Sequence, residues 1–241
     1  MRDAADSAEF LTTQWSMVLR AAADDGGLAR AALAELCQRY WYPLYAYLRR
    51  RGVGVEEAED VMQGFFARLL EKQVLAGISV ERGRFRSFLL TALKNYLANE
   101  RHRAAAEKRG GGRAVLSLDV DSGESRLQLQ PHDNDTPERL FERQWALTLL
   151  EVVVQRLEAE HAAAGKSRPF ELLKGALTGD TERLPYAEIA QELGTSEEAA
   201  RQSASRLRKR YRELLRAEVA STVANEQEVD EEIRGLFAIL G

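Results

Sequence analysis

Hydrophobic residues recur along most of this chain at intervals of three and four positions, the spacing of one face of an α-helix. The pattern predicts helices over 12–23, 28–51, 55–72, 84–106, 137–164, 170–177, 186–193 and about 197–216. A further run of apolar residues at helical spacing predicts a helix over 229–240. Pro43 lies inside the second of these segments and should either kink that helix or mark a junction between two helices.

The helical periodicity stops between Gly110 and Thr136, where three glycines are followed by scattered hydrophobic and acidic residues. Two runs, at 115–120 and 126–130, alternate polar and apolar residues, which leaves short strands open as an alternative, although strands outside a sheet are marginally stable. We therefore predict an all-α protein made of two small helical domains that are joined by a flexible linker. The predicted parts are a first domain over 1–109, the linker over 110–136, a second domain over 137–218 and a C-terminal extension over 219–241.

The helices at 186–193 and 197–216 are separated by a tight turn. Pro185 suits a helix start, Gly194 suits a left-handed cap at a helix end, and Ser196 suits the N-cap of the next helix. The second helix carries a narrow apolar seam at spacings of four and three residues, formed by Ala200, Ala204, Leu207, Tyr211 and Leu214. This pattern predicts a helix–turn–helix, in which the second helix enters the major groove of DNA.

The face of that second helix opposite the seam is polar and mostly basic. Between Arg201 and Arg216 there are seven Lys or Arg residues and one acid, Glu213. Such a one-signed face favours DNA binding, and a surface helical hairpin whose charges are merely solvated is the alternative interpretation. The candidate residues for reading base edges are Glu198, Arg201, Gln202, Ser205, Arg206 and Lys209.

Composition narrows the function classes. The lone cysteine, Cys37, excludes an internal disulfide and a multi-cysteine metal site, and the three histidines share no ligand spacing with acids. No glycine-rich phosphate loop and no nucleophile–base pattern is recognisable, so we expect neither an enzyme nor a cofactor. No run approaches the roughly 18 apolar residues of a membrane span, and the acidic N-terminal residues do not resemble a signal peptide. We therefore expect a cytoplasmic protein without membrane insertion.

Basic and acidic residues are concentrated in different segments of the chain. The net charge of −4 argues against a protein that coats nucleic acid indiscriminately. The segment from Arg82 to Arg113 nevertheless contains nine Lys or Arg residues and two acids, while the middle of the chain and its C-terminal part are acidic. Basic segments within an acidic chain indicate DNA contacts that are confined to chosen surfaces.

Several stretches together resemble the extracytoplasmic-function (ECF) type of bacterial RNA polymerase sigma factor. The paired helices of the family's region two are similar to LAELCQRYWYPLYAYLRRRG and VEEAEDVMQGFFARLLEK, and its melting helix is similar to GRFRSFLLTALKNYLANERHR. The opening helix and the helix–turn–helix of region four are similar to TPERLFERQWALTLLEVVVQRLE and PYAEIAQELGTSEEAARQSASRLRKRYRELL. Two departures stand out: Gly64 replaces an expected acid, and residues 162–183 are more polar and longer than is usual.

The resemblance implies an alternative sigma factor whose partners are promoter DNA and core RNA polymerase. AEDVMQ resembles the surface that docks on the clamp helices of the largest polymerase subunit, which implies docking through Asp60, Gln63 and Phe66. The helix–turn–helix at 186–216 would read the minus-thirty-five element. Asn95 would line a pocket for a flipped base that the 76–84 loop closes. Recognition and melting of the minus-ten element would involve Arg84, Arg86, Phe88, Lys94, Asn95, Asn99, Arg101 and Arg103.

Other interpretations remain open at this stage. A helix–turn–helix repressor or activator that acts without core polymerase would account for residues 184–216 but leave the 84–103 helix without a role. For Phe88, ordinary packing in a core is the competing interpretation, and for Asp60 and Gln63 it is a solvated helix face. An inhibitor (anti-sigma) protein or another regulator is a further class of partner that the family resemblance implies.

Overall fold

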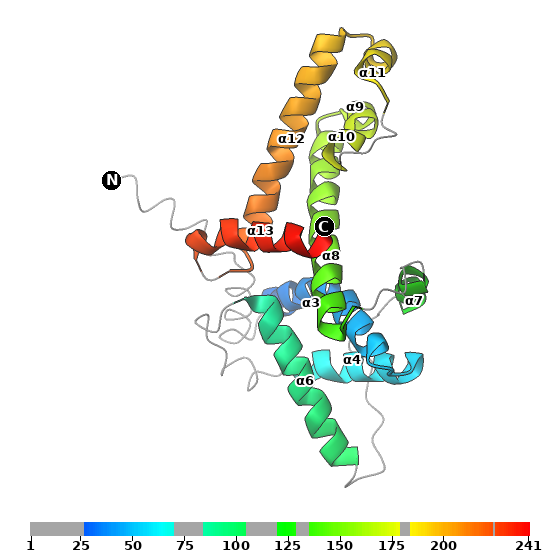
Figure 1. Cartoon of the computed structure of the whole chain (residues 1–241), viewed down its shortest axis with the longest axis vertical. Coiled ribbons are helices and arrows are strands. Elements are labelled where there is room, and N and C mark those ends of the chain that lie inside the picture. The colour runs from blue at the N-terminus through cyan, green and yellow to red at the C-terminus, as the bar shows by residue number, and fades with distance from the viewer. Residues whose placement is uncertain (1–26, 70–83, 105–119, 129–134, 179–183, 224) are drawn as a thin grey trace, which may run out of the picture. The chain divides into compact units, whose positions relative to one another are not determined.

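In a computed structural model, the described residues of the chain are 27–69, 84–104, 120–128, 135–178, 184–223 and 225–241. Every regular element in these ranges is a helix, and none of them contains a strand (Figure 1). The predicted all-α class is confirmed for this part of the chain. The predicted helix at 12–23 and the loop at 76–83 lie outside the described residues.

The helices largely follow the predicted segments. Their bounds are α3 Gly27–Arg50, α4 Val55–Leu69, α6 Phe85–Ala104, α7 Val120–Gln128, α8 Pro137–Ala163, α9 Ser167–Leu173, α10 Gly175–Thr178, α11 Tyr186–Leu193, α12 Glu197–Ala220, the 3-10 turn η3 Glu226–Glu228, and α13 Val229–Leu240. A single helix, α3, runs through Pro43, so the alternative of a junction between two helices is wrong. None of the described helices is long and apolar enough to cross a membrane.

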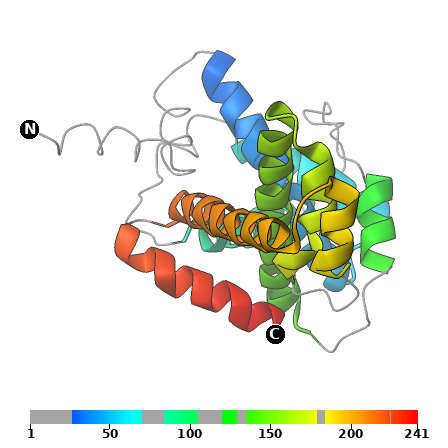
Figure 2. The same cartoon turned by 90° about the horizontal axis from the view of Figure 1, so that it is seen from above.

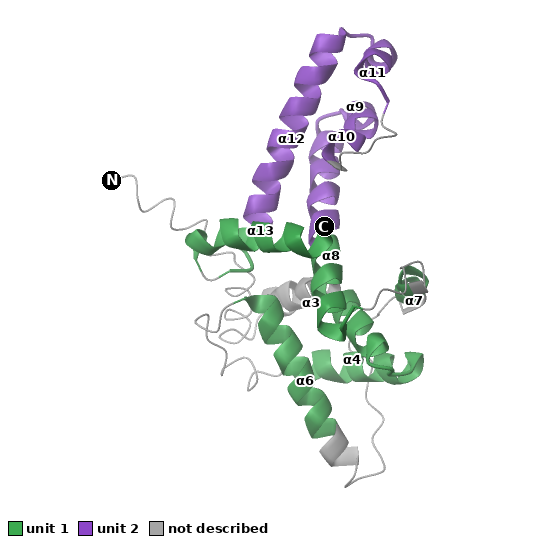
Figure 3. Cartoon of the chain, in the orientation of Figure 1, with its two compact units in different colours: residues 1–148, 219–241 green, residues 149–218 purple. Residues whose placement is uncertain are grey.

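The chain forms two compact units, coloured green and purple in Figure 3. Unit 1 consists of residues 1–148 and 219–241, and unit 2 consists of residues 149–218. The first part of α8 and the C-terminal helix α13 therefore belong to the same unit as α3, α4 and α6.

The core of unit 1 is built from aromatic residues that several helices contribute. The ring of Tyr40 on α3 meets the ring of Phe85 on α6 edge to face at 5.4 Å between centroids. Trp145 on α8 donates from its indole nitrogen to the Tyr40 hydroxyl at 3.3 Å. Phe66 on α4 and Phe141 on α8 are both fully buried. Large aromatic side chains of this kind dominate the apolar area that a small helical domain can bury.

A short helix, α7, occupies part of the segment that was predicted to be a linker. Glu124 of α7 accepts hydrogen bonds from Arg49 Nε and from the Tyr45 hydroxyl of α3, both at 2.7 Å. The Arg49 contact holds the pKa of Glu124 below its ordinary value. Gly123 lies against the Trp41 ring, where a Cβ would come within 2.9 Å of a ring carbon. Residues 120–128 form a helix docked on α3, so the alternative of strands is wrong for Val120 and for 126–128. The rest of the two alternating runs lies outside the described residues.

The predicted C-terminal helix is present as α13, which packs within unit 1. Its buried residues are Val229, Glu232 and Leu236, whereas Phe237 is 52% exposed. A carboxylate is thus buried between two aliphatic side chains on one face of this helix. Because an unpaired buried charge is costly, Glu232 requires cationic partners.

Unit 2 is formed by the second part of α8, the short helices α9 to α11, and most of α12. Its core contains Val153 and Leu157 from α8, Phe170 from α9, and Ile189 from α11, all at most 2% exposed. Helices α9, α10 and α11 lie together beside α8 and α12, and the view from above in Figure 2 shows the same grouping. This packing fixes the position of the turn between α11 and α12.

Phe66 supplies a stability test of the unit 1 core. Phe66→Ala should lower the free energy of unfolding by about 3–5 kcal/mol, because it deletes a fully buried aromatic ring and leaves a cavity. Chemical denaturation followed by circular dichroism measures the change. Phe237→Ala is the matched control and should cost far less, since that ring is half exposed. Equal, small effects of the two substitutions would contradict the placement of Phe66 in the core.

Candidate nucleic-acid interface

The turn between α11 and α12 has the geometry that the sequence predicts. Gly194 adopts the left-handed conformation, with φ 62° and ψ 38°, and its N–H donates to carbonyls at the end of α11. The Ser196 hydroxyl accepts a hydrogen bond from the N–H of Ala199 at 3.2 Å, which caps the start of α12. A residue with a Cβ is strained at a positive φ, so glycine suits this turn. The two predicted helices and the tight turn between them are confirmed.

The apolar seam of α12 is buried, and the opposite face is exposed. Ala200, Ala204, Leu207 and Leu214 are at most 3% exposed, and Tyr211 is partly buried. All six residues that were predicted to read DNA are exposed: Glu198, Arg201, Gln202, Ser205, Arg206 and Lys209. Because they recur every three or four positions, they form one strip along the helix.

Several side chains of this strip contact side chains one turn away on the same helix. Gln202 donates its amide to Glu198 at 3.3 Å, and Arg201 pairs with Glu197 at 2.5 Å. The Arg206 guanidinium donates to the Ser203 hydroxyl at 3.0 Å. Such exposed contacts contribute little to stability, so a ligand can replace them at small cost. The strip therefore presents both acceptors and cationic donors to a partner.

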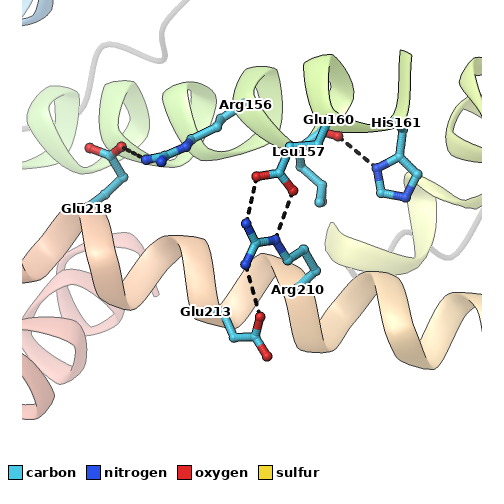
Figure 4. A network of polar contacts seen from close by, with 7 residues as sticks. All are labelled: Arg156, Leu157, Glu160, His161, Arg210, Glu213 and Glu218. Atoms are coloured by element: carbon cyan, nitrogen blue, oxygen red, sulfur yellow. Dashed lines mark hydrogen bonds and ion pairs between the residues drawn. The ribbon is translucent and has the colours of Figure 1, made fainter. Parts of the chain in front are cut away.

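One cation of α12 outside the strip, Arg210, contacts helix α8. Arg210 donates to both carboxylate oxygens of Glu160 on α8, at 2.8 and 2.7 Å, and also to Glu213 at 3.2 Å (Figure 4). Closer to the end of α12, Arg156 of α8 pairs with Glu218 at 3.0 Å. The sequence analysis counts Arg210 among the seven cations between Arg201 and Arg216, whereas its bidentate contact with Glu160 holds α12 against α8.

Tyr186 at the start of α11 is a positioning residue that the sequence analysis did not single out. Its hydroxyl accepts a hydrogen bond from Arg208 of α12 at 3.3 Å. The guanidinium of Arg201 lies over its ring, 5.5 Å from the centroid. These two contacts tie the first helix of the motif to the exposed helix. The useful signal in the sequence is the pairing of an aromatic residue after Pro185 with arginines on the next helix.

The second predicted nucleic-acid surface lies on α6, in unit 1. Asn95 and Asn99, one helical turn apart, are both exposed. Lys94 pairs with Glu138 of α8 at 2.8 Å and lowers the pKa of that carboxyl. Phe88 is partly buried, with its ring centroid 6.0 Å from that of Phe85. The side chains of two further predicted residues, Arg101 and Arg103, lie outside the described part of the structure.

The two arginines at the start of this surface, Arg84 and Arg86, differ in their exposure to solvent. Arg86 is only 3% exposed, and its guanidinium pairs with Glu142 of α8 at 2.5 Å and with Glu232 of α13. Its carbon Cζ lies 4.2 Å from the centroid of the Trp145 ring. Arg84 is partly exposed and pairs with Glu232 at 2.8 Å. In this conformation Arg86 is a buried structural cation, because its partners on two other helices compensate its desolvation.

Of the three residues predicted to dock on polymerase, two lie at the surface and one lies in the core. Asp60 on α4 is exposed. Gln63, one turn later, is partly exposed and donates its amide to Glu59 at 3.2 Å. The Phe66 side chain is fully buried in the core of unit 1, so it is not available to a partner in this conformation.

Comparison of the chain with models of protein families, with curated proteins and with solved structures found no match. The described residues contain no group of three or more histidine, cysteine, aspartate or glutamate side chains placed to hold a metal ion. The functional interpretation therefore rests on the residues of the chain and on the geometry of the two candidate surfaces.

The contact between Glu160 and Arg210 gives a pH-dependent prediction. Arg210 holds the pKa of Glu160 below its ordinary value. The stabilisation is therefore fully present at neutral pH and is lost as the pH falls through the pKa of Glu160 in the folded protein. A double-mutant cycle of Glu160→Gln and Arg210→Gln should give a coupling free energy of about 0.5–1 kcal/mol at neutral pH, which disappears in acid.

The coupling is measured from the free energies of unfolding of the wild type, the two single variants and the double variant. Each value is obtained by denaturant titration at several pH values. Arg206→Gln is the control for Arg210→Gln, because it removes the same charge from the exposed strip of α12. It should show no coupling to Glu160→Gln. A coupling energy that persists unchanged at low pH would contradict the assigned ion pair.

Proposed function

We propose that this protein is an alternative RNA polymerase sigma factor of the ECF type, which directs core polymerase to specific promoters and helps to open them. The observation that carries the proposal is the helix–turn–helix of unit 2, whose second helix exposes six polar and basic side chains in one strip. An α-helix with such a strip fits the major groove, where amide and guanidinium groups distinguish base pairs by their hydrogen-bonding edges. In this proposal, α12 reads the minus-thirty-five element.

The surface of α6 supports the second part of the proposal. The exposed amides of Asn95 and Asn99 follow the basic start of this helix, and amide groups bind the edges of unpaired bases. Partly buried aromatics such as Phe88 suit stacking against extruded bases. We propose that Asn95 lines the pocket for a flipped base of the minus-ten element. Arg86 is left out of the proposed contact set for this conformation, because it is buried.

Docking on core polymerase is the part of the proposal that separates a sigma factor from a helix–turn–helix repressor. We assign docking to the exposed face of α4 that carries Asp60 and Gln63, and we exclude Phe66 from it. Core polymerase would hold both DNA-contacting surfaces on one promoter, which makes the second contact effectively intramolecular. The free chain, with a net charge of −4, is then expected to bind promoter duplex weakly and to act in the cytoplasm with the polymerase.

Gln202 tests the reading face. Gln202→Ala should weaken binding of the holoenzyme to its upstream element by about 1–3 kcal/mol if the amide contacts a base edge. The target sequence is first enriched from a randomised duplex pool with the wild-type holoenzyme, and binding of each variant is then titrated. Gln155→Ala removes an exposed amide from α8 and is the control. Unchanged affinity and unchanged sequence preference in Gln202→Ala would remove this residue from the reading face.

Asp60 tests docking. Asp60→Arg should weaken binding to core polymerase on the order of tenfold or more, because a reversed charge at an interface costs a few kcal/mol. Thermal stability should change little, since Asp60 is exposed. Glu158→Arg, an exposed charge reversal in unit 2, is the control and should bind core normally. Quantitative pull-down with purified core, together with melting curves, makes both measurements.

Three outcomes of that experiment are informative. Loss of binding in Asp60→Arg alone supports the proposed docking face. Wild-type binding by a folded Asp60→Arg protein places docking elsewhere on the chain. A wild-type chain that never binds core polymerase, yet binds duplex DNA tightly by itself, favours the repressor or activator function instead.

A further inference from the structure

The C-terminal segment of the chain holds the start of α6. The two carboxylate oxygens of Glu232 on α13 pair with Arg84 Nε, at 2.8 Å, and with Arg86 Nη1. Between these arginines, the N–H of Phe85 donates to the carbonyl of Thr222 at 3.2 Å, in the turn that follows α12. The C-terminal segment thus contacts Arg84, which directly precedes α6, and the first two residues of α6, all within unit 1.

The charges of the two segments are complementary. Residues 226–232 contain five acids: Glu226, Glu228, Asp230, Glu231 and Glu232. One of them, Glu232, pairs with Arg84 and Arg86. These arginines belong to a segment that holds nine Lys or Arg residues between Arg82 and Arg113. Carboxylate and phosphate groups both carry negative charge and form ion pairs with guanidinium groups. Glu232 therefore offers to Arg84 and Arg86 the chemistry that a DNA phosphate would offer.

The fully buried face of α13 is small. In this helix of 12 residues, Val229, Glu232 and Leu236 are the buried ones. An isolated helix of this length is marginally stable in water, so α13 depends on its contacts with unit 1. Departure of α13 would also not leave Arg86 without partners, because Glu142 pairs with it at 2.5 Å and the Trp145 ring lies 4.2 Å from its Cζ.

We propose that α13 is an autoinhibitory segment, in which Glu232 occupies the arginines at the start of α6 in place of a phosphate of promoter DNA. Binding of the opened minus-ten region then requires α13 to be displaced, after which Arg84 contacts the DNA backbone. This inference rests on the proposed function, because it assigns a regulation to the same α6 surface. The competing ligand is the sugar–phosphate backbone next to the unpaired bases.

The first experiment compares two substitutions in the full-length chain bound to core polymerase. Glu232→Gln keeps the shape of the side chain and removes its charge. It should tighten binding to a forked DNA with a single-stranded segment by about three- to tenfold, because occupancy of the inhibited state reduces apparent affinity. Glu231→Gln removes the same charge from an exposed position of the same helix and should change affinity by less than about twofold.

The second experiment uses the wild-type chain and does not depend on how a variant folds. Hydrogen exchange should show protected amides in α13 of the free protein. Addition of core polymerase and forked DNA should remove this protection, while α4 stays protected. Amides of α13 that remain protected in the complex with forked DNA would overturn the proposal, as would unchanged or weaker binding by a folded Glu232→Gln protein.

The two proposals fail in different ways. If the wild-type chain binds neither core polymerase nor forked DNA in its presence, the proposed function is wrong, and the autoinhibition is wrong with it. If the complex forms and opens promoters while α13 stays protected, only the autoinhibition is wrong, and α13 is then a fixed structural part of unit 1.

Discussion

The burial of Arg86 is the constraint on which the rest of unit 1 depends. A guanidinium stays charged at any physiological pH, and burial lowers the pKa of Arg86 without neutralising it. The charge therefore needs compensation, which Glu142 of α8 and Glu232 of α13 provide together with the Trp145 ring. Removing all of these partners would be expensive, because it would leave the charge buried and unpaired. This requirement ties α6 to two helices that are distant in sequence, and it explains why the start of α8 and the C-terminal helix belong to unit 1.

The local features of the fold could be predicted from the sequence because short-range rules determine them. The turn at Gly194 and the cap at Ser196 follow from backbone geometry at single positions, and both are present. Helical periodicity also predicted the buried seam and the exposed strip of α12, since both follow from the position of each residue around one helix. The helix in the C-terminal extension was predicted for the same reason. None of these features required knowledge of a partner far along the chain.

The features that the sequence did not predict all depend on such distant partners. Arg86 lies in a segment whose pattern fits surface contacts, and only its packing against other helices shows that it is buried. For Phe66, the periodicity of the 55–72 helix predicted the inward face, where the residue lies, whereas the family resemblance assigned it to polymerase docking. Arg210 is one of seven cations on α12, and its role follows from the position of Glu160, 50 residues away. Helix α7 is nine residues long and contains a glycine, so its own propensity is weak. It is held by Arg49 of α3 through Glu124, a contact that no local pattern reveals.

The central claim is that the chain gives core RNA polymerase the ability to start at particular promoters. Run-off transcription tests it most directly, with purified core polymerase and a pool of DNA templates, with and without the protein. The account predicts transcripts that begin at defined positions only when the protein is present, downstream of a shared pair of upstream sequence elements. Transcripts with the same start sites and yields in both reactions would contradict it.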